Sequence, residues 1–416
     1  MNQHITAAPE HVPADLVVSF DQLNGPEILA FPPTAAKRVA NGRPIFYSNY
    51  YGGYWVVANY EYAREVYQNA ELFQQWPNGV PFNPFSKLFK PLYLNPPEHG
   101  KWRKVLTPLF SPRALQKQED FIRGIAREQV ALLAPRGKAE LVQDYAEIIP
   151  SRMFGFFLGL PMERFEEFAQ MGFDLIFGPA QAIKNGATAE QAKAVRAKAN
   201  AEIDEFIARL IPERRKNPGD DLVSILLAGE VDGQPLSEED VINMTTLLFF
   251  AGTDTTRAVL TFAFMHLANH HELRDRLVND PAIVKNASEE LIRLHGFHLS
   301  ARQLTEDVEF HGVQMKKGEL VLLSTGAAGR DENKFPDAET ADFDRRNAHS
   351  HLTFGAGIHR CIGSHSGTLQ LRIALEEFHK VIKDYHNDPD GQPTRFVGGQ
   401  GKVIPENLDL AWTPVR

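Results

Sequence analysis

Hydrophobic residues recur at helical spacing through most of this chain, from about residue 111 to residue 380. One example is Phe121, Ile125 and Leu132, which this spacing places on one face of a helix whose other face is charged. A charged, alanine-rich helix is predicted over about 187–215. The pattern therefore predicts a mainly helical protein.

The longest predicted helix begins after Ser237, whose hydroxyl can cap its first turn, and continues to about Asn269. At ~1.5 Å per residue it would extend over roughly 50 Å. Its middle contains A-G-T-D-T-T, residues 251–256, where Gly252 alone costs ~1 kcal/mol relative to alanine. Threonine hydroxyls can also bond to carbonyls one turn earlier and open a helix locally. This stretch either lets two helices cross closely or forms a groove in which an acid and an alcohol deliver protons.

Alternating apolar and polar residues indicate strands in two places. V-E-F-H-G-V-Q-M and E-L-V-L-L, between Arg302 and Leu323, predict a hairpin. A second pair is predicted around 44–47 and 54–58. The fold class predicted from these patterns is mainly α with small β-sheets (α+β).

Composition limits the classes of function. The chain has 416 residues, of which 43% are hydrophobic, and no Gly/Ser-rich linker divides it, so one domain is expected. A net charge of -9 argues against a nucleic-acid partner. The first residues show no signal-peptide pattern and no stretch approaches ~18 uninterrupted apolar residues, so neither secretion nor a membrane span is expected. A single cysteine allows no internal disulfide, which fits a reducing cytosol and a cytoplasmic location.

That cysteine, Cys361, lies in F-G-A-G-I-H-R-C-I-G, which runs from Phe354 to Gly363. Glycines on both sides of the sulfur leave the backbone bare, as the close approach of a flat, bulky group requires. A helix is predicted to follow, so the sulfur lies near a helix N-terminus that favours the thiolate. Such a thiolate is a metal ligand or a nucleophile; the alternative is a buried structural cysteine.

The cysteine segment resembles the haem-thiolate signature of the cytochrome P-450 monooxygenases, Phe-Gly-x-Gly-x-His-x-Cys-x-Gly. A-G-T-D-T-T resembles the pattern of their central helix, Ala/Gly-Gly-x-Asp/Glu-Thr. A Glu-x-x-Arg pair and an R-D-x-x-x-F-P stretch at 330–336 follow in the family's order. The chain departs from the family at Ser366-Gly367-Thr368, where Leu-Ala-Arg is usual. The likeness covers nearly the whole chain and is strongest to the soluble bacterial members that hydroxylate camphor and cineole.

This resemblance implies a triangular prism of helices, with haem b between the long central helix and a proximal helix after the cysteine. It implies one domain over 1–416, with a β-richer part at about 1–60. The helical core would comprise about 60–295 and 363–385, and a β-rich meander with the cysteine loop about 296–362.

The resemblance also implies roles for individual residues. The Cys361 thiolate would be the axial ligand of the haem iron, Thr255 would hydrogen-bond bound oxygen, and Asp254 would relay protons from solvent. Taken singly, the other charged candidates could also be ordinary surface charges. The residues expected to bind the cofactor are His99, Arg103, Arg302, Phe354, Gly355, His359, Cys361 and Gly363.

Glu290 and Arg293 are one helical turn apart, a spacing that usually means a solvated pair worth only ~0.2–0.5 kcal/mol. In the family the pair is instead a buried scaffold tied to an arginine before the cysteine loop. Arg346, in F-D-R-R-N, is the arginine predicted for that place.

The substrate pocket is expected where the central helix meets the proline- and phenylalanine-rich segment 75–97. Prolines at that density exclude a regular helix, so the segment is either a functional lid or poorly packed. His298 would hydrogen-bond a substrate oxygen, or else face solvent or a propionate. The predicted lining is Phe82, Phe85, Phe89, Leu247, Phe250, Ala251, His298 and Leu299, which suits a small hydrophobic substrate such as a terpenoid or small aromatic.

The expected activity is insertion of one oxygen atom of O2 into a C–H bond by a monomeric enzyme. Electrons would come from a ferredoxin and its NADH- or NADPH-dependent reductase, because the chain has neither a flavin domain nor iron–sulfur cysteines. The ferredoxin would dock on Arg360, Lys101, Lys104 and Arg113. The alternatives are a peroxide-driven peroxygenase, a haem-thiolate sensor or carrier without turnover, and a cysteine-nucleophile hydrolase.

Overall fold

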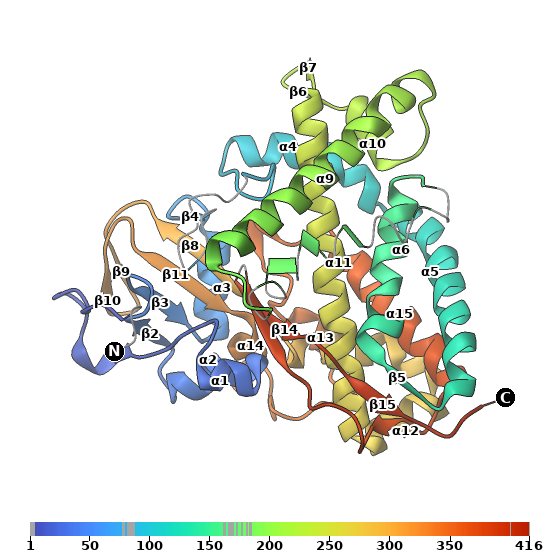
Figure 1. Ribbon diagram of the computed structural model, residues 1–416. Coiled ribbons are helices and arrows are strands. Elements are labelled where there is room, and N and C mark those ends of the chain that lie inside the picture. The colour runs from blue at the N-terminus through green and yellow to red at the C-terminus, as the bar shows by residue number, and fades with distance from the viewer. Residues whose placement is uncertain are drawn as a thin grey trace.

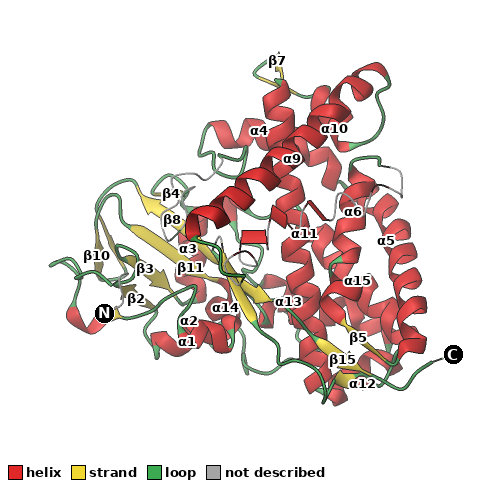
Figure 2. Cartoon of the chain, viewed as in Figure 1, coloured by secondary structure: helices red, strands yellow, loops and turns green. Residues whose placement is uncertain are grey.

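The structure is a computed structural model that describes residues 5–76, 80, 88–160, 164, 170–171, 174–175, 178–179, 182, 185–399 and 401–415. A helical region makes up most of the molecule, and a β-rich region that contains the N-terminus lies on one side of it (Figures 1 and 2). This arrangement confirms the predicted fold class.

The helices are α1 (Pro26–Ala30), α2 (Pro32–Ala40), α3 (Tyr60–Gln68), α4 (Glu98–Leu106), α5 (Pro112–Leu133), α6 (Ile148–Phe157), α9 (Ala189–Lys216), α10 (Leu222–Leu227), α11 (Glu238–Asn269), α12 (His271–Asn279), α13 (Val284–Leu294), α14 (Thr325–Gly329) and α15 (Ser364–Val381). The predicted start of the longest helix is confirmed: the Ser237 hydroxyl accepts a hydrogen bond from the Asp240 backbone N–H (3.1 Å), and the Asp240 carboxylate accepts one from the Ser237 N–H (3.3 Å). The helix α11 runs through the centre of the molecule, where it contacts α6, α9 and α15 (Figure 1).

The strands are β1 (Val17–Val18), β2 (Ile45–Ser48), β3 (Tyr54–Val57), β4 (Phe73–Gln75), β5 (Lys138–Glu140), β6 (Glu230–Val231), β7 (Gln234–Pro235), β8 (Leu299–Leu304), β9 (Val308–Phe310), β10 (Val313–Met315), β11 (Leu320–Ser324), β12 (His386–Asn387), β13 (Phe396–Gly399), β14 (Lys402–Pro405) and β15 (Asp409–Ala411). The largest sheet has the order β1-β2-β3-β11-β8-β4. Its strand β11 is parallel to β3, with Leu322 opposite Val56, and antiparallel to β8, with Leu322 opposite Ala301.

The predicted β2–β3 pair forms, but the hairpin predicted between V-E-F-H-G-V-Q-M and E-L-V-L-L does not. Strands β2 and β3 pair antiparallel, and β9 and β10 form a hairpin whose two turn residues, His311 and Gly312, have φ of 49° and 81°. The predicted E-L-V-L-L strand is β11, which leaves this hairpin and joins the large sheet.

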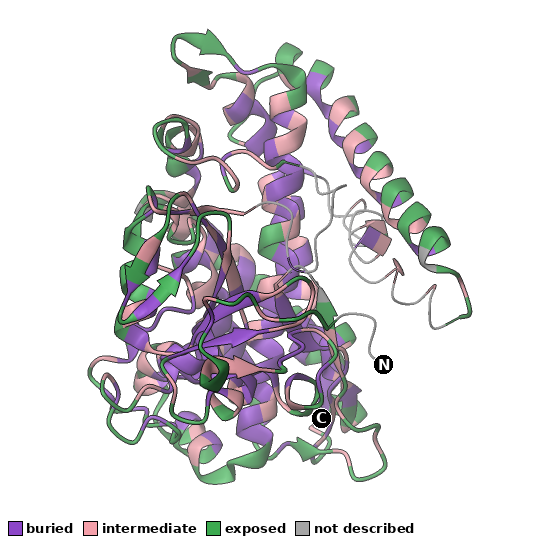
Figure 3. Ribbon diagram, turned by 90° about the vertical axis from the view of Figure 1, so that its left-hand side faces the viewer, coloured by how far each residue is buried: buried purple, intermediate pink, exposed green. Residues whose placement is uncertain are grey.

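The buried residues gather in the interior, where the helices meet one another and the large sheet (Figure 3). The face predicted for α5 is wrong at one position, because Leu132 is 60% exposed. Ile122, Ile125 and Leu133 form the buried side that packs toward α15. Residues 122 and 133 lie about a quarter turn around the helix from residue 132. A few apolar residues at helical spacing therefore do not identify the centre of the buried face of the helix.

Among the described residues, no helix has the length and apolarity that a membrane crossing requires.

Candidate active site

The loop around Cys361 folds back on itself and is seated against the end of α3. The Cys361 N–H donates to the Phe354 carbonyl (2.8 Å), and the Gly355 N–H donates to the Leu352 carbonyl (2.8 Å). Gly357 has a φ of +67°, and a Cβ atom there would lie 2.4 Å from the Tyr67 carbonyl oxygen. Glycine is therefore required at 357 by both backbone conformation and space.

Cys361 is a free cysteine, the only cysteine in the sequence. Burial by the surrounding protein raises the pKa of this thiol, whereas the Gly363 backbone N–H and the charges of Arg103 and Arg360 lower it, and burial prevails. Gly363, whose N–H favours the thiolate, is the N-cap of α15, so the sulfur lies near a helix N-terminus as the sequence predicts. A bound metal ion would deprotonate the thiol outright.

A short stretch in the middle of α11 is open although its neighbours are buried. Ala251 and Gly252 are exposed, whereas Phe249 is 1% and Thr253 6% exposed. A Cβ atom added to Gly252 would meet no atom within 4 Å. The small residues here therefore leave open space beside the helix. They do not mark a place where a second helix packs closely against α11.

The alcohol and the acid next to this space are held differently. The Thr255 hydroxyl donates to the Ala251 carbonyl (2.6 Å), the bond to the preceding turn that threonine favours in helices. Asp254 is 2% exposed and pairs with Lys402 (Nζ to Oδ2, 2.5 Å) and Arg257 (Nη2 to Oδ1, 3.2 Å). Burial pushes the pKa of Asp254 up, but Lys402 and then Arg257 push it down further, so the net shift is downward and the carboxylate is ionised.

The residues predicted to hold the cofactor's propionates converge on His359. The rings of His99 and His359 are 4.1 Å apart, and Arg103 donates to the Arg360 carbonyl. Burial lowers the pKa of His99 to about 4 and that of His359 to about 3, and the charges of Arg302 and Arg103 contribute to the shift at His359. Both imidazoles are therefore neutral.

This group of residues fits a haem. Within the described part of the chain, the buried His359 Nε2 has no hydrogen-bond partner. Arg302 is 4% exposed and bonds only neutral oxygens, Gln75 Oε1 (3.0 Å) and the Ala301 carbonyl (2.9 Å), and no described carboxylate pairs with Arg302 or Arg103. Two such cations and an unsatisfied ring nitrogen suit the carboxylates of a porphyrin.

The Glu-x-x-Arg pair is buried and has a different third member from the one predicted. Glu290 and Arg293 are both 0% exposed and form a two-bond ion pair, Nε to Oε2 at 2.7 Å and Nη2 to Oε1 at 2.8 Å. Arg345, not Arg346, completes it, with its Nε 2.9 Å from Glu290 Oε1. Arg346 is exposed, because the turn from Asp342 to Arg345 directs the first arginine of the pair inward.

The predicted pocket residues lie on three elements. Leu247 and Leu299 are buried, and the ring of Phe89 stacks on Phe250 of α11 at 6.5 Å, so the end of the proline-rich segment reaches the central helix. His298 is half-buried, and burial lowers its pKa to about 4. Phe82 and Phe85 lie outside the described residues.

Lys402 was not among the predicted site residues, although its Nζ lies 4.7 Å from the centre of the Phe250 ring. Lys402 belongs to no recognisable sequence motif, so its position beside Asp254 is evident only from the fold.

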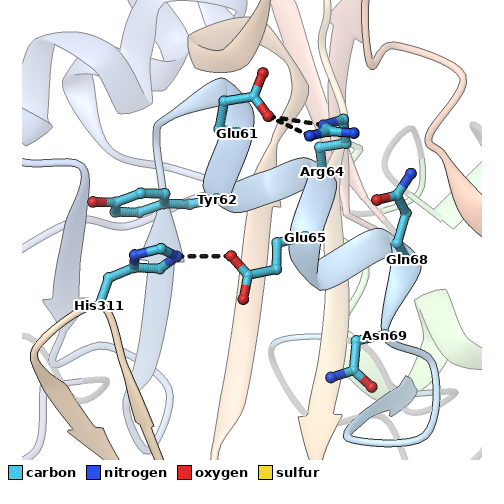
Figure 4. Close-up of a pocket in the computed structure, with 7 residues that line it drawn as sticks. All are labelled: Glu61, Tyr62, Arg64, Glu65, Gln68, Asn69 and His311. Carbon is cyan, nitrogen blue, oxygen red and sulfur yellow. Dashed lines mark hydrogen bonds and ion pairs between the residues drawn. The ribbon is translucent and has the colours of Figure 1, made fainter.

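A hollow of about 330 Å³ also occurs on the outer side of α3, beside the β9–β10 turn (Figure 4). Its lining is polar, and there His311 stacks on Tyr62 (3.6 Å) and bonds to Glu65 (2.8 Å). It contains none of the residues predicted for the site, so it is not the active site.

The chain is similar to known proteins over most of its length. The sequence profile of the family described as Cytochrome P450 matches residues 44–380. The chain is 31% identical to a probable cytochrome P450 127A1 of Sinorhizobium fredii over 97% of this chain and 96% of the relative. It is 30% identical to cytochrome P450(BM-1) of Priestia megaterium over 84% of this chain and 86% of the relative.

Solved structures agree. The crystal structure of cytochrome P450 CYP101C1 is 29% identical, covers 98% of this chain and all of its own, and has a TM-score of 0.87. That of CYP101J2 is 27% identical, with the same coverage and a TM-score of 0.85. The chain therefore belongs to the cytochrome P450 family of haem-thiolate monooxygenases, with protoporphyrin IX haem as its cofactor.

Proposed function

We propose that this enzyme inserts one oxygen atom of O2 into a C–H bond of a small, compact hydrophobic substrate of the terpenoid or small-aromatic class. The observation that carries the proposal is the open stretch at Ala251 and Gly252, which lies beside an ionised acid and a threonine and next to the stacked Phe89 and Phe250 rings. An apolar wall with few polar groups selects substrates by shape and leaves His298 to fix orientation.

In this proposal each residue of the site has one task. Haem held by the Cys361 thiolate supplies the binding and activation of O2. Arg302, Arg103, His99 and His359 hold the propionates. Asp254 would take a proton from solvent and pass it to the hydroxyl of Thr255, which would donate its own proton to an acceptor bound in the open space beside Gly252.

Carbon monoxide binding and substrate screening test the proposal together. The reduced protein with CO should show the strongly red-shifted Soret band of thiolate-ligated haem. A terpenoid and aromatic panel, read by the spin-state shift, should contain tight binders, and ¹⁸O₂ should label their products. Label from water, or turnover driven by peroxide alone, would count against O2-dependent monooxygenation.

Thr255→Ala is expected to keep substrate binding and to divert most reducing equivalents to peroxide. The variant removes the hydroxyl while Ala251 and Asp254 stay in place, so the loss falls on proton delivery. The measurement is product formed per NADH consumed, with peroxide assayed in parallel. Thr261→Ala is the matched control, since its hydroxyl makes the same bond one turn back, to the Arg257 carbonyl (2.8 Å). Tight coupling in Thr255→Ala would remove Thr255 from the relay.

We also propose a ferredoxin as the electron donor, docking around the cysteine loop. Arg360, Lys104 and Arg113 are exposed, and no described carboxylate pairs with them, whereas Lys101 is already paired with Glu98 and Asp232. Lys101 therefore contributes little net charge.

The rate of reduction by an acidic ferredoxin should fall steeply as salt rises, because a Debye length shrinks from ~10 Å at 0.1 M to ~3 Å at 1 M. Stopped-flow reduction across a salt series measures it. Arg360→Glu should reduce the dependence of the reduction rate on salt concentration, while Lys101→Ala, as control, should not. A rate that is independent of salt would rule out this docking surface.

A further inference from the structure

Lys402 is a buried cation that no predicted role accounts for. It is 7% exposed, it begins β14, and its Nζ lies 2.5 Å from Asp254 Oδ2. The acid comes from the centre of α11, so this contact joins the C-terminal hairpin to the central helix (Figure 1).

The backbone of the hairpin is fixed against the predicted substrate wall. The Leu299 N–H donates to the Gly401 carbonyl (2.7 Å), and His298 forms an isolated β-bridge with Lys402. A Cβ atom on Gly401 would lie 2.8 Å from the Leu299 carbonyl oxygen, so the two segments are in close contact. The position of the lysine is therefore set by the segment that would contact a substrate.

The charges around Asp254 show why this contact matters. Arg257, one turn along the same helix, moves with Asp254, whereas Lys402 comes from a separate element. A carboxylate that carries protons must leave at least one cation during its cycle, and the contact to Lys402 is the one that a movement between α11 and the hairpin would open. A buried ion pair adds little to folding stability, because an apolar pair of similar volume often gives the same stability.

We propose that Lys402 is a positioning residue that holds the Asp254 carboxylate and couples it to the substrate wall formed by His298 and Leu299. When the pair opens, Asp254 takes one proton from solvent, passes one proton toward Thr255 and returns to Lys402 as the carboxylate. This inference rests on the proton-relay role proposed above for Asp254.

The experiment compares haem-loaded Lys402→Met, Lys402→Arg and Asp254→Asn with the wild type, using a substrate identified by the spin-state screen. Lys402→Met should lower product per NADH, slow product formation on the order of tenfold (less than the 10²–10⁴-fold typical of a lost general acid) and change the solvent deuterium isotope effect. Lys402→Arg should restore all three. Lys316→Met is the control, because Lys316 pairs with Asp307 on the surface, with 47% and 60% exposure.

A second readout does not depend on turnover. In urea unfolding, the midpoint shift of the Lys402→Met/Asp254→Asn double variant should be smaller than the sum of the two single shifts. The reason is that each single change leaves the other member of the ion pair buried without this partner, whereas the double change removes both. If the two single midpoint shifts add up to the shift of the double variant, the proposed interaction between Lys402 and Asp254 is contradicted.

The two proposals fail in different ways. If Asp254→Asn changes coupling and the isotope effect but Lys402→Met matches the wild type, Lys402 is not a positioning residue. If Asp254→Asn itself changes neither, the relay role of Asp254 fails and the inference about Lys402 fails with it.

Discussion

Cys361→Ala is expected to lose the red-shifted Soret band of the reduced CO complex and all O2-dependent product. Cys361 is the only cysteine in the sequence, and its loop is held by the bond from its own N–H to the Phe354 carbonyl, which alanine keeps. The loop should therefore keep its shape and lose only the ligand. Absorption and EPR spectra of the haem-loaded variant, together with product assays, measure the effect.

A matched control lies five residues further along. Ser366→Ala removes a similarly small polar group from α15, where the Ser366 hydroxyl donates to Gln118 Oε1 at 2.9 Å, away from the sulfur. It should keep the thiolate spectrum. Wild-type optical and EPR signatures in Cys361→Ala would refute the assignment of the ligand.

Arg293→Ala should cost about 3–5 kcal/mol in the free energy of unfolding, because it leaves the Glu290 carboxylate buried with one partner fewer. It also removes the donors to the Ala338 (2.8 Å) and Thr340 (3.2 Å) carbonyls, which brace the segment before the cysteine loop. Urea unfolding followed by circular dichroism measures the loss, and haem retention should fall with it.

The neighbouring arginines provide the control for this prediction. Arg345→Ala should be strongly destabilising because its Nε bonds Glu290, whereas Arg346→Ala should stay within about 0.5 kcal/mol because that side chain is exposed. Equal losses for the two variants would contradict the assignment of Arg345 to the buried network.

Local signals in the sequence were sufficient where one residue determines one feature. The cap at Ser237 and the threonine bonds in α11 follow from side-chain chemistry within a single turn. It was harder to predict which of two adjacent side chains points inward. The arginines at 345 and 346 are equivalent in any motif, and only the turn that starts at Asp342 decides which one is buried.

Long-range partners that belong to no motif could not be predicted. Lys402 reaches Asp254 because a hairpin near the end of the chain is pinned to Leu299, and no spacing within the sequence encodes that meeting. The desolvation that raises the pKa of the Cys361 thiol is equally hidden from the sequence, because the tertiary fold imposes it and the adjacent residues do not.

The seating of the cysteine loop on α3 affects how the protein matures. Gly357 packs against the Tyr67 carbonyl, and the Tyr60 hydroxyl donates to the Ser350 carbonyl at 2.6 Å across 290 positions of the chain. The cradle can therefore close only after the ligand loop has been synthesised, because it joins residues 290 positions apart. Haem is accordingly expected to enter late in folding, and chimaeras between relatives should exchange α3 and the ligand loop as one unit.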